Sequence, residues 1–159
     1  MSTINIGISD LNIAKPPNIL ATYALGSCIG ICLHDKVRNI GGLVHIMLPD
    51  SHESTKASDN PRRYADTGIA ELVQLLQRNG AVKSCLTAKI AGGAQMFQTN
   101  LETFNIGSRN TVAVKKVLAK YGIPIIAEDT GSNYGRTVFF DVATGVMQVK
   151  SVSKGVVNL

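Results

Sequence analysis

The chain has 159 residues, enough to bury a sizeable core, and we expect one domain over residues 1–159. Three cysteines, an odd number, exclude a fully paired disulfide framework and favour a reducing compartment. No apolar run approaches the roughly 20 residues that span a bilayer, and no basic segment followed by an apolar run opens the chain. We therefore expect a soluble cytoplasmic protein without membrane insertion.

The charge balance is basic, with 16 Lys and Arg against 11 Asp and Glu, a formal net charge of +5. Nucleic acid is one possible reason for such a balance. The basic residues are scattered, however, and aromatic residues make up only 5% of the chain, so base stacking is poorly supported. We therefore expect the basic surface to favour acidic protein partners, and we do not expect the protein to bind nucleic acid.

In the N-terminal third, alternating apolar residues predict β-strands. The expected strands cover residues 3–13 (ending near Asp10), 19–25, 29–34 and 41–48. In the third of them, Ile29, Ile31 and Leu33 share one face while Cys32 and His34 share the other. The fourth is almost wholly apolar, as a strand covered on both faces should be. Residues 49–61 are polar and predict a surface loop.

The rest of the chain adds two helices and further strands. Helices are expected over residues 64–79 and 108–121, the second N-capped by Ser108 with Val114 and Leu118 facing inward. Strands are expected over residues 85–90, 123–128, 135–142 and 146–152. Several links are too short for crossover connections, so the fold class is α/β, a layered arrangement of mixed β-sheets flanked by two main helices. The strand order does not follow from the sequence.

Cys28 lies in a short turn between two apolar runs, with glycines two residues before and after it at Gly26 and Gly30. This arrangement is the cysteine counterpart of the nucleophile elbow, in which small neighbours let the backbone turn sharply and expose the reactive atom. Taken alone, a cysteine in an apolar strand is usually a small buried hydrophobe, and the glycines beside Cys28 could mark a bulge or close strand packing.

His45 is the polar member of the apolar run over residues 43–48. A core histidine is often satisfied by a backbone carbonyl, which is the structural alternative here. A cysteine that can ionise and a histidine that can take its proton are also the minimum parts of a nucleophilic catalyst acting on a carbonyl. A thiolate beside an imidazolium would lower the cysteine pKa below its free value of about 8.5.

Two other readings of these motifs are weaker. Cys28, Cys32, His34 and His45 are zinc-ligand types, but their spacing fits no compact pattern, and we predict no metal and no cofactor. Gly92-Gly93 lacks the Lys-Ser/Thr pair of a phosphate loop and is better explained as a tight loop in a packed core. His34 and His52 are predicted to be surface residues.

Met96 and Phe97 are two large apolar residues in a polar segment that contains Gln95, Gln98 and Thr99. They can be anchored inward as core residues, or they can form an exposed contact, because exposed apolar patches mark partner surfaces. The sequence leaves both possibilities open.

Several of these motifs together resemble the chemoreceptor glutamine deamidase family, CheD, in chain order from about residue 21 to residue 136. The matching segments are LGSC at 25–28, GG at 41–42, HIMLPD at 45–50, YAD at 64–66, KIAGGA at 89–94, MF at 96–97, NIGSRN at 105–110 and EDTG at 128–131. The resemblance implies layered sheets with helices outside.

The resemblance also implies an activity, hydrolysis of glutamine side-chain amides on bacterial chemoreceptors during chemotaxis adaptation. Carried over by position, Cys28 matches the nucleophile, His45 the base and Thr22 the third member. The family further implies a CheC-type phosphatase as a partner, with the contact expected around Met96 and Phe97. The rival hypothesis is a non-catalytic chemotaxis adaptor that binds receptors and that phosphatase; the intact Cys-His-Thr set favours the protein-glutamine glutaminase.

Overall fold

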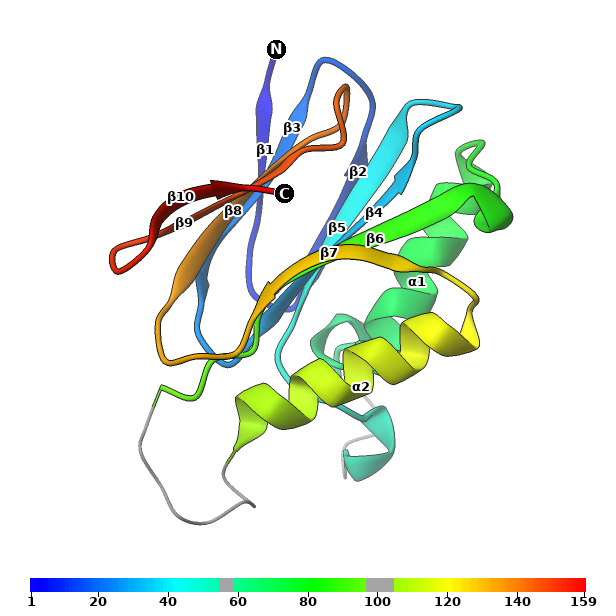
Figure 1. Cartoon of the computed structure of the whole chain (residues 1–159). Coiled ribbons are helices and arrows are strands. Elements are labelled where there is room, and N and C mark those ends of the chain that lie inside the picture. The colour runs from blue at the N-terminus through cyan, green and yellow to red at the C-terminus, as the bar shows by residue number, and fades with distance from the viewer. Residues whose placement is uncertain (55–58, 97–104) are drawn as a thin grey trace.

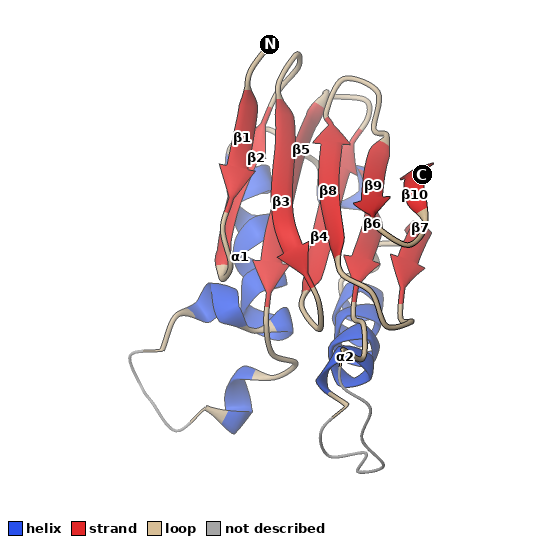
Figure 2. Ribbon diagram, turned by 90° about the vertical axis from the view of Figure 1, so that its left-hand side faces the viewer, coloured by secondary structure: helices blue, strands red, loops and turns tan. Residues whose placement is uncertain are grey.

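The computed structural model describes residues 1–54, 59–96 and 105–159. Two five-stranded sheets lie face to face, and two helices cover the far face of one of them (Figure 1). We call the sheet between the other sheet and the helices the middle sheet and its neighbour the outer sheet. Figure 2 shows the strands of the two sheets running roughly along one direction.

The outer sheet has the order β1-β3-β8-β9-β10. Its strands are β1 (Thr3–Ile6), β3 (Ile19–Leu25), β8 (Arg136–Asp141), β9 (Met147–Ser151) and β10 (Gly155–Asn158). The middle sheet has the order β2-β5-β4-β6-β7. Its strands are β2 (Asp10–Ala14), β5 (Ile40–Ile46), β4 (Ile29–Asp35), β6 (Leu86–Gly92) and β7 (Ile125–Thr130). One pair in each sheet, β1–β3 and β6–β7, is parallel and the rest are antiparallel, so both sheets are mixed.

The helices are α1 (Ala65–Arg78) and α2 (Ile106–Lys120), and short 3-10 turns lie at η1 (Ser51–Glu53), η2 (Pro61–Arg63) and η3 (Lys83–Cys85). Both α-helices pack on the middle sheet, so the predicted α/β class of layered mixed sheets with two helices is confirmed. None of the helices in the described ranges has the length and apolar character needed to cross a bilayer.

Two apolar cores follow from this layering. The alternation predicted for β4 is confirmed, because Ile29, Ile31 and Leu33 join the core between the middle sheet and the helices. Cys32, on the opposite face, joins the core between the two sheets with Leu25 and Phe140. Strands β4 and β5 of the middle sheet are thus buried on both faces, which explains why they read as nearly continuous apolar runs.

Besides shifts of one or two residues at the ends of several elements, three features differ from the sequence expectations. Residues 3–13 form two strands in different sheets, because Ser9, with φ of 59°, takes a left-handed conformation that breaks the strand between β1 and β2. Helix α2 is capped by Asn105, whose side chain accepts a hydrogen bond from the Ser108 backbone N–H, so the expected Ser108 cap is wrong. Strand β10 was not anticipated, since residues 155–158 show no alternation strong enough to predict it.

The glycine pair of β5 lets this strand pack closely on both sides. A Cβ atom at Gly42 would lie 2.6 Å from Leu72 Cδ1 of α1 and 3.2 Å from Ile13 Cγ2 of β2. A Cβ atom at Gly41 would lie 3.0 Å from Phe140 Cε2 of the outer sheet. The missing side chains therefore set how near α1 and the outer sheet come to the strand that carries His45.

Gly42→Val should destabilise the protein by about 1–3 kcal/mol, because the added methyl groups overpack the contact with Leu72. Urea unfolding followed by circular dichroism measures the change. Gly7→Val is the matched control, because no atom lies within 4 Å of the Cβ position at Gly7. Equal losses of stability in the two variants would contradict this account of β5.

Candidate active site

Thr22 and His45 meet between the two sheets, although they come from different sheets and lie 23 positions apart in the chain. Both residues are fully buried. Thr22 Oγ1 lies 2.7 Å from His45 Nδ1, and the same hydroxyl donates a hydrogen bond to the Ile6 carbonyl oxygen of β1 at 2.7 Å. The sequence prediction that Thr22 and His45 belong to one site has this direct contact in its favour.

The geometry fixes the tautomer of the His45 ring. A hydroxyl has a single hydrogen, and that of Thr22 is directed to the Ile6 carbonyl. The hydrogen between Thr22 Oγ1 and His45 Nδ1 must therefore come from the ring, so Nδ1 carries the proton and Nε2 does not. Nε2 is buried and has no hydrogen-bond partner among the described residues. It is an unprotonated nitrogen available to accept a proton.

Burial also keeps the ring uncharged. Desolvation lowers the pKa of His45 from its ordinary value to about 4. The imidazole is thus neutral at pH 7, which is the form a general base needs.

Cys28 comes directly before β4, diagonally across from His45. Gly30 of β4 pairs with His45 of β5, and a Cβ atom on Gly30 would point toward Leu25 and Thr22 of the outer sheet. Cys28, two residues earlier, is partly buried and packs against the core between the sheets. Diagonal neighbours of this kind have Cα atoms about 7–8 Å apart, and Gly30 leaves the space beside them free of a side chain.

No hydrogen bond joins Cys28 to His45 in the described part of the chain, since His45 Nε2 has no partner there. Catalytic hydrogen bonds are often long in unliganded enzymes and tighten when substrate binds. Burial raises the pKa of the Cys28 thiol, while its own backbone N–H has the smaller opposite effect. The structure therefore favours a neutral thiol beside a neutral imidazole and not the ion pair expected from the sequence, because burial disfavours both charges.

The turn that carries Cys28 is tied to the end of β6. The Gly93 N–H donates to the Cys28 carbonyl at 2.9 Å, and the Ala94 N–H donates to the Gly26 carbonyl at 2.9 Å. A Cβ atom at Gly92 would lie 2.1 Å from the Cys28 carbonyl oxygen, a clash that only glycine avoids. Gly92 and Gly93 have φ values of 115° and 67°, which glycine adopts most readily. The expectation of a tight loop in a packed core is confirmed at these two glycines.

Two further predictions concern histidine and zinc. His34 is buried, with Nε2 2.8 Å from the Val142 carbonyl, so the prediction of a surface residue is wrong for His34; His52 is exposed as predicted. The carbonyl needs a donor, so His34 Nε2 carries its proton. Cys28, Cys32, His34 and His45 do not form a cluster of ligand atoms among the described residues.

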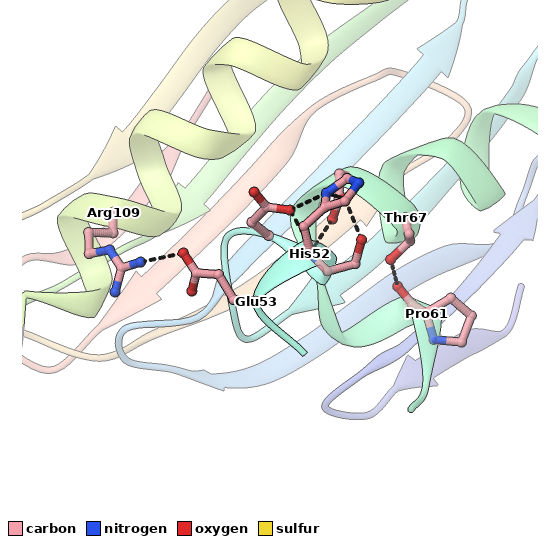
Figure 3. Close-up of polar contacts among 8 residues, drawn as sticks. His52, Glu53, Pro61, Thr67 and Arg109 are labelled. Atoms are coloured by element: carbon pink, nitrogen blue, oxygen red, sulfur yellow. Dashed lines mark hydrogen bonds and ion pairs between the residues drawn. The ribbon is translucent and has the colours of Figure 1, made fainter. Parts of the chain in front are cut away.

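The segment after β5 is held by polar contacts to both helices (Figure 3). His52 Nδ1 lies 2.7 Å from Asp50 Oδ1 and 3.7 Å from Asp66 Oδ2 of α1, and Arg109 of α2 pairs with Glu53 at 2.8 Å. The possible metal-ligand atoms of Asp50, His52 and Asp66 lie within 4.8 Å of one another. Their mutual bonds and the capping of η1 by Asp50 already explain the cluster, and we assign no metal to it.

Met96 lies beside the Cys28 turn, because a Cβ atom at Gly26 would be 3.2 Å from Met96 Cγ. Its side chain is 47% exposed, which favours the surface alternative over a core position. Phe97 lies outside the described residues.

Asn110 of α2 was not singled out from the sequence. It is fully buried, and its Nδ2 donates to the Ser27 carbonyl at 2.9 Å and to the Met47 carbonyl at 2.8 Å. A signal was present, because Asn110 lies four residues before Val114 and eight before Leu118, the inward positions of the helix. A polar residue on that stripe needs a polar partner inside the protein.

Comparisons with known proteins agree on one family. A family model described as "CheD chemotactic sensory transduction" matches residues 47–151. A protein of Clostridium novyi named "Probable chemoreceptor glutamine deamidase CheD" is 52% identical over 155 residues, covering 96% of this chain and 95% of the relative. Proteins with the same name from Caldanaerobacter subterraneus and Desulforamulus reducens are 48% and 47% identical, covering 96% and 94% of this chain and 95% and 90% of theirs.

One solved structure shares the fold. The crystal structure of the Bacillus licheniformis hypothetical protein YfiH superposes with a TM-score of 0.50 at 18% identity, over 76% of this chain. The chain spans about half the length of that protein, 50%. At this identity the likeness concerns the fold alone.

The depressed pKa of His45 predicts how stability depends on pH. Below about pH 6.5 the unfolded chain binds a proton at His45 and the folded chain does not, so stability falls as the pH drops from about 6.5 to 4. The loss attributable to His45 is about 3–4 kcal/mol at most. Urea unfolding of the wild type and of His45→Gln across this range measures it. Parallel curves for the two proteins would contradict the assignment.

Proposed function

This chain belongs to the CheD family, and we propose that it is a chemoreceptor glutamine deamidase that converts glutamine side chains to glutamate. The relatives that cover nearly the whole chain carry that name. The observation that supports the chemistry best is the contact of Thr22 with His45 Nδ1, which leaves the ring's Nε2 unprotonated and without a hydrogen-bond partner among the described residues. We further propose that the chain forms one domain and works in the cytoplasm, where receptor signalling helices lie.

The proposed reaction is an acyl transfer in two halves. His45 Nε2 takes the thiol proton as Cys28 Sγ attacks the amide carbon, and the carbonyl electrons move to oxygen. The tetrahedral intermediate collapses as His45 returns the proton to the leaving nitrogen, which departs as ammonia and leaves a thioester. Water then attacks the thioester with His45 again as base, giving glutamate and the free thiol.

Thr22 has a positioning role in this scheme. Its oxygen accepts a hydrogen bond from the Nδ1–H group, so the ring presents Nε2 as the base throughout, and this bond also stabilises the imidazolium formed during attack. A hydroxyl adds no full negative charge, unlike the carboxylate of other triads. This explains why we expect Thr22 to contribute less than Cys28 or His45.

The partner assignment remains a proposal. Exposed Met96 lies against the turn that carries Cys28, so a surface that includes Met96 would border the proposed substrate site. The family suggests a CheC-type phosphatase for that surface, with Phe97 as a further contact. A non-catalytic adaptor would need the same surface but not the buried Thr22–His45 pair.

Cys28→Ala should abolish glutamine deamidation, and Cys28→Ser should be nearly as inactive because a hydroxyl ionises far less readily than a thiol. Mass spectrometry of chemoreceptor cytoplasmic fragments, before and after incubation, detects the conversion of amide to acid. Cys85→Ser, at a cysteine away from the two sheets' shared core, is the control and should keep activity. If the wild type binds the fragments but converts no glutamine, the adaptor hypothesis stands and the enzyme proposal falls.

Thr22→Val should lower kcat by about 10- to 100-fold, less than the 10²–10⁴-fold that a general base usually contributes. Valine keeps the shape of threonine but leaves Nδ1 without its acceptor. Thr22→Ser retains the hydroxyl and should retain most of the activity. Full activity in Thr22→Val, measured under the same conditions, would remove Thr22 from the site.

A further inference from the structure

The buried amide of Asn110 joins α2 to the two segments that carry the proposed nucleophile and base. Its Nδ2 donates at 2.9 Å to the carbonyl of Ser27, directly before Cys28, and at 2.8 Å to the carbonyl of Met47, two residues after His45. The orientation of the amide is determined by these partners. A flipped side chain would place Oδ1 against two carbonyl oxygens, neither of which can donate a hydrogen bond.

The bond to Ser27 orients the peptide that precedes Cys28. A trans peptide is planar, and its carbonyl and N–H groups point in opposite directions. Because the Ser27 carbonyl points at Asn110 on the helix side, the Cys28 N–H points away from the helix. No other residue in 1–54, 59–96 or 105–159 provides an acceptor for this N–H. The same N–H interacts with the Cys28 thiol, and this interaction lowers the pKa of that thiol.

The peptide that follows Cys28 is fixed as well, since the Cys28 carbonyl accepts the hydrogen bond from Gly93. Both peptide planes on either side of the Cys28 Cα atom are thus held by partners from other elements. A free N–H in a fixed direction beside a nucleophile is the arrangement of an oxyanion hole, in which the donor is in place before charge develops.

We propose that Asn110 is a positioning residue that holds the Cys28 N–H as a donor to the oxyanion formed when Cys28 attacks a glutamine amide. The inference rests on the proposed deamidase function and deepens it. As the bond between Sγ and carbon forms, the carbonyl electrons move to oxygen, and the Cys28 N–H donates to that oxygen. The donor is released when the C–N bond breaks and the carbonyl of the thioester re-forms.

A purely structural role for Asn110 predicts different chemistry. If Asn110 only joins α2 to the middle sheet, its loss should disturb every reaction of Cys28 to a similar degree. Alkylation by iodoacetamide separates the two roles, because the thiol displaces iodide at a saturated carbon and no oxyanion forms. Deamidation needs the oxyanion donor, whereas alkylation needs only an accessible and ionisable thiol.

The test compares wild type, Asn110→Asp and Asn105→Asp. Aspartate has nearly the shape of asparagine but cannot donate to the Ser27 carbonyl when ionised. Asn105→Asp makes the same atomic change at the N-cap of the same helix, where the side chain accepts a hydrogen bond from the Ser108 N–H, so the capping role is kept. Three quantities are measured for each protein: kcat on a receptor fragment, the rate constant for alkylation of Cys28, and the melting temperature.

We expect Asn110→Asp to lower kcat by about 10- to 100-fold, because one oxyanion donor is usually worth 10²–10³-fold and here it is misdirected but not deleted. The alkylation rate constant should change by less than about threefold, and Asn105→Asp should match the wild type in both. Equal falls in kcat and alkylation, or an unchanged kcat, would overturn the proposal. Inactive wild type would instead overturn the deamidase function, and this role with it.

A second measurement covers the case in which Asn110→Asp does not fold. A peptide aldehyde that replaces the target glutamine with its aldehyde forms a hemithioacetal with Cys28 and places an oxygen where the oxyanion would be. In the wild-type protein, the amide proton of Cys28 should move strongly downfield in a ¹H–¹⁵N spectrum when this adduct forms. An unmoved Cys28 amide signal in the adduct would overturn the proposal without any variant.

Discussion

The hydrogen bonds that run from the Ile6 carbonyl through the Thr22 hydroxyl to His45 depend on the contact between the two sheets. Ile6 and Thr22 are paired on β1 and β3 of the outer sheet, and His45 lies on β5 of the middle sheet. The outer sheet therefore supplies both the acceptor that holds the imidazole and the backbone carbonyl that orients that acceptor. Any change that separates the sheets would break the contact between Thr22 and His45 that sets the His45 tautomer. The close packing of Gly41 in β5 against Phe140 in the outer sheet therefore supports the site.

Burial favours the uncharged forms of both Cys28 and His45, unlike the thiolate and imidazolium of a cysteine–histidine ion pair. Both charges are disfavoured in the core between the sheets, since the pKa of Cys28 is raised and that of His45 is lowered. In the proposed reaction, proton transfer must then accompany attack on the carbonyl, and charge appears only in the presence of substrate. A resting neutral thiol reacts slowly with oxidants and stray electrophiles, because the thiolate is the reactive form. The substrate carbonyl and the donors around it become the main means of stabilising the developing charge.

The sequence predicted the layers and most elements because apolar alternation reports burial directly. It singled out Cys28 and His45 as candidate site residues, from glycine spacing and from a polar residue in an apolar strand. It could not show that the segment around Ser9 divides one expected strand between two sheets, because a single left-handed residue leaves little trace in the apolar pattern. His34 was misplaced for a related reason: its partner, the Val142 carbonyl, lies in the turn that follows β8, 108 positions along the chain. Asn110 was detectable only as a polar residue on an inward helix stripe, and the two carbonyls that explain it are set by tertiary structure.

The tautomer of His45 is the most direct test of the central claim that Thr22 prepares the ring as a base. A long-range ¹H–¹⁵N spectrum of histidine-labelled protein at pH 7 distinguishes the protonated nitrogen from the unprotonated one in each ring. His34 is an internal reference, because its Nε2 donates to the Val142 carbonyl and it must show the opposite tautomer. We predict that His45 is neutral and carries its proton on Nδ1. A proton on Nε2, or a ring charged at pH 7, would contradict the account.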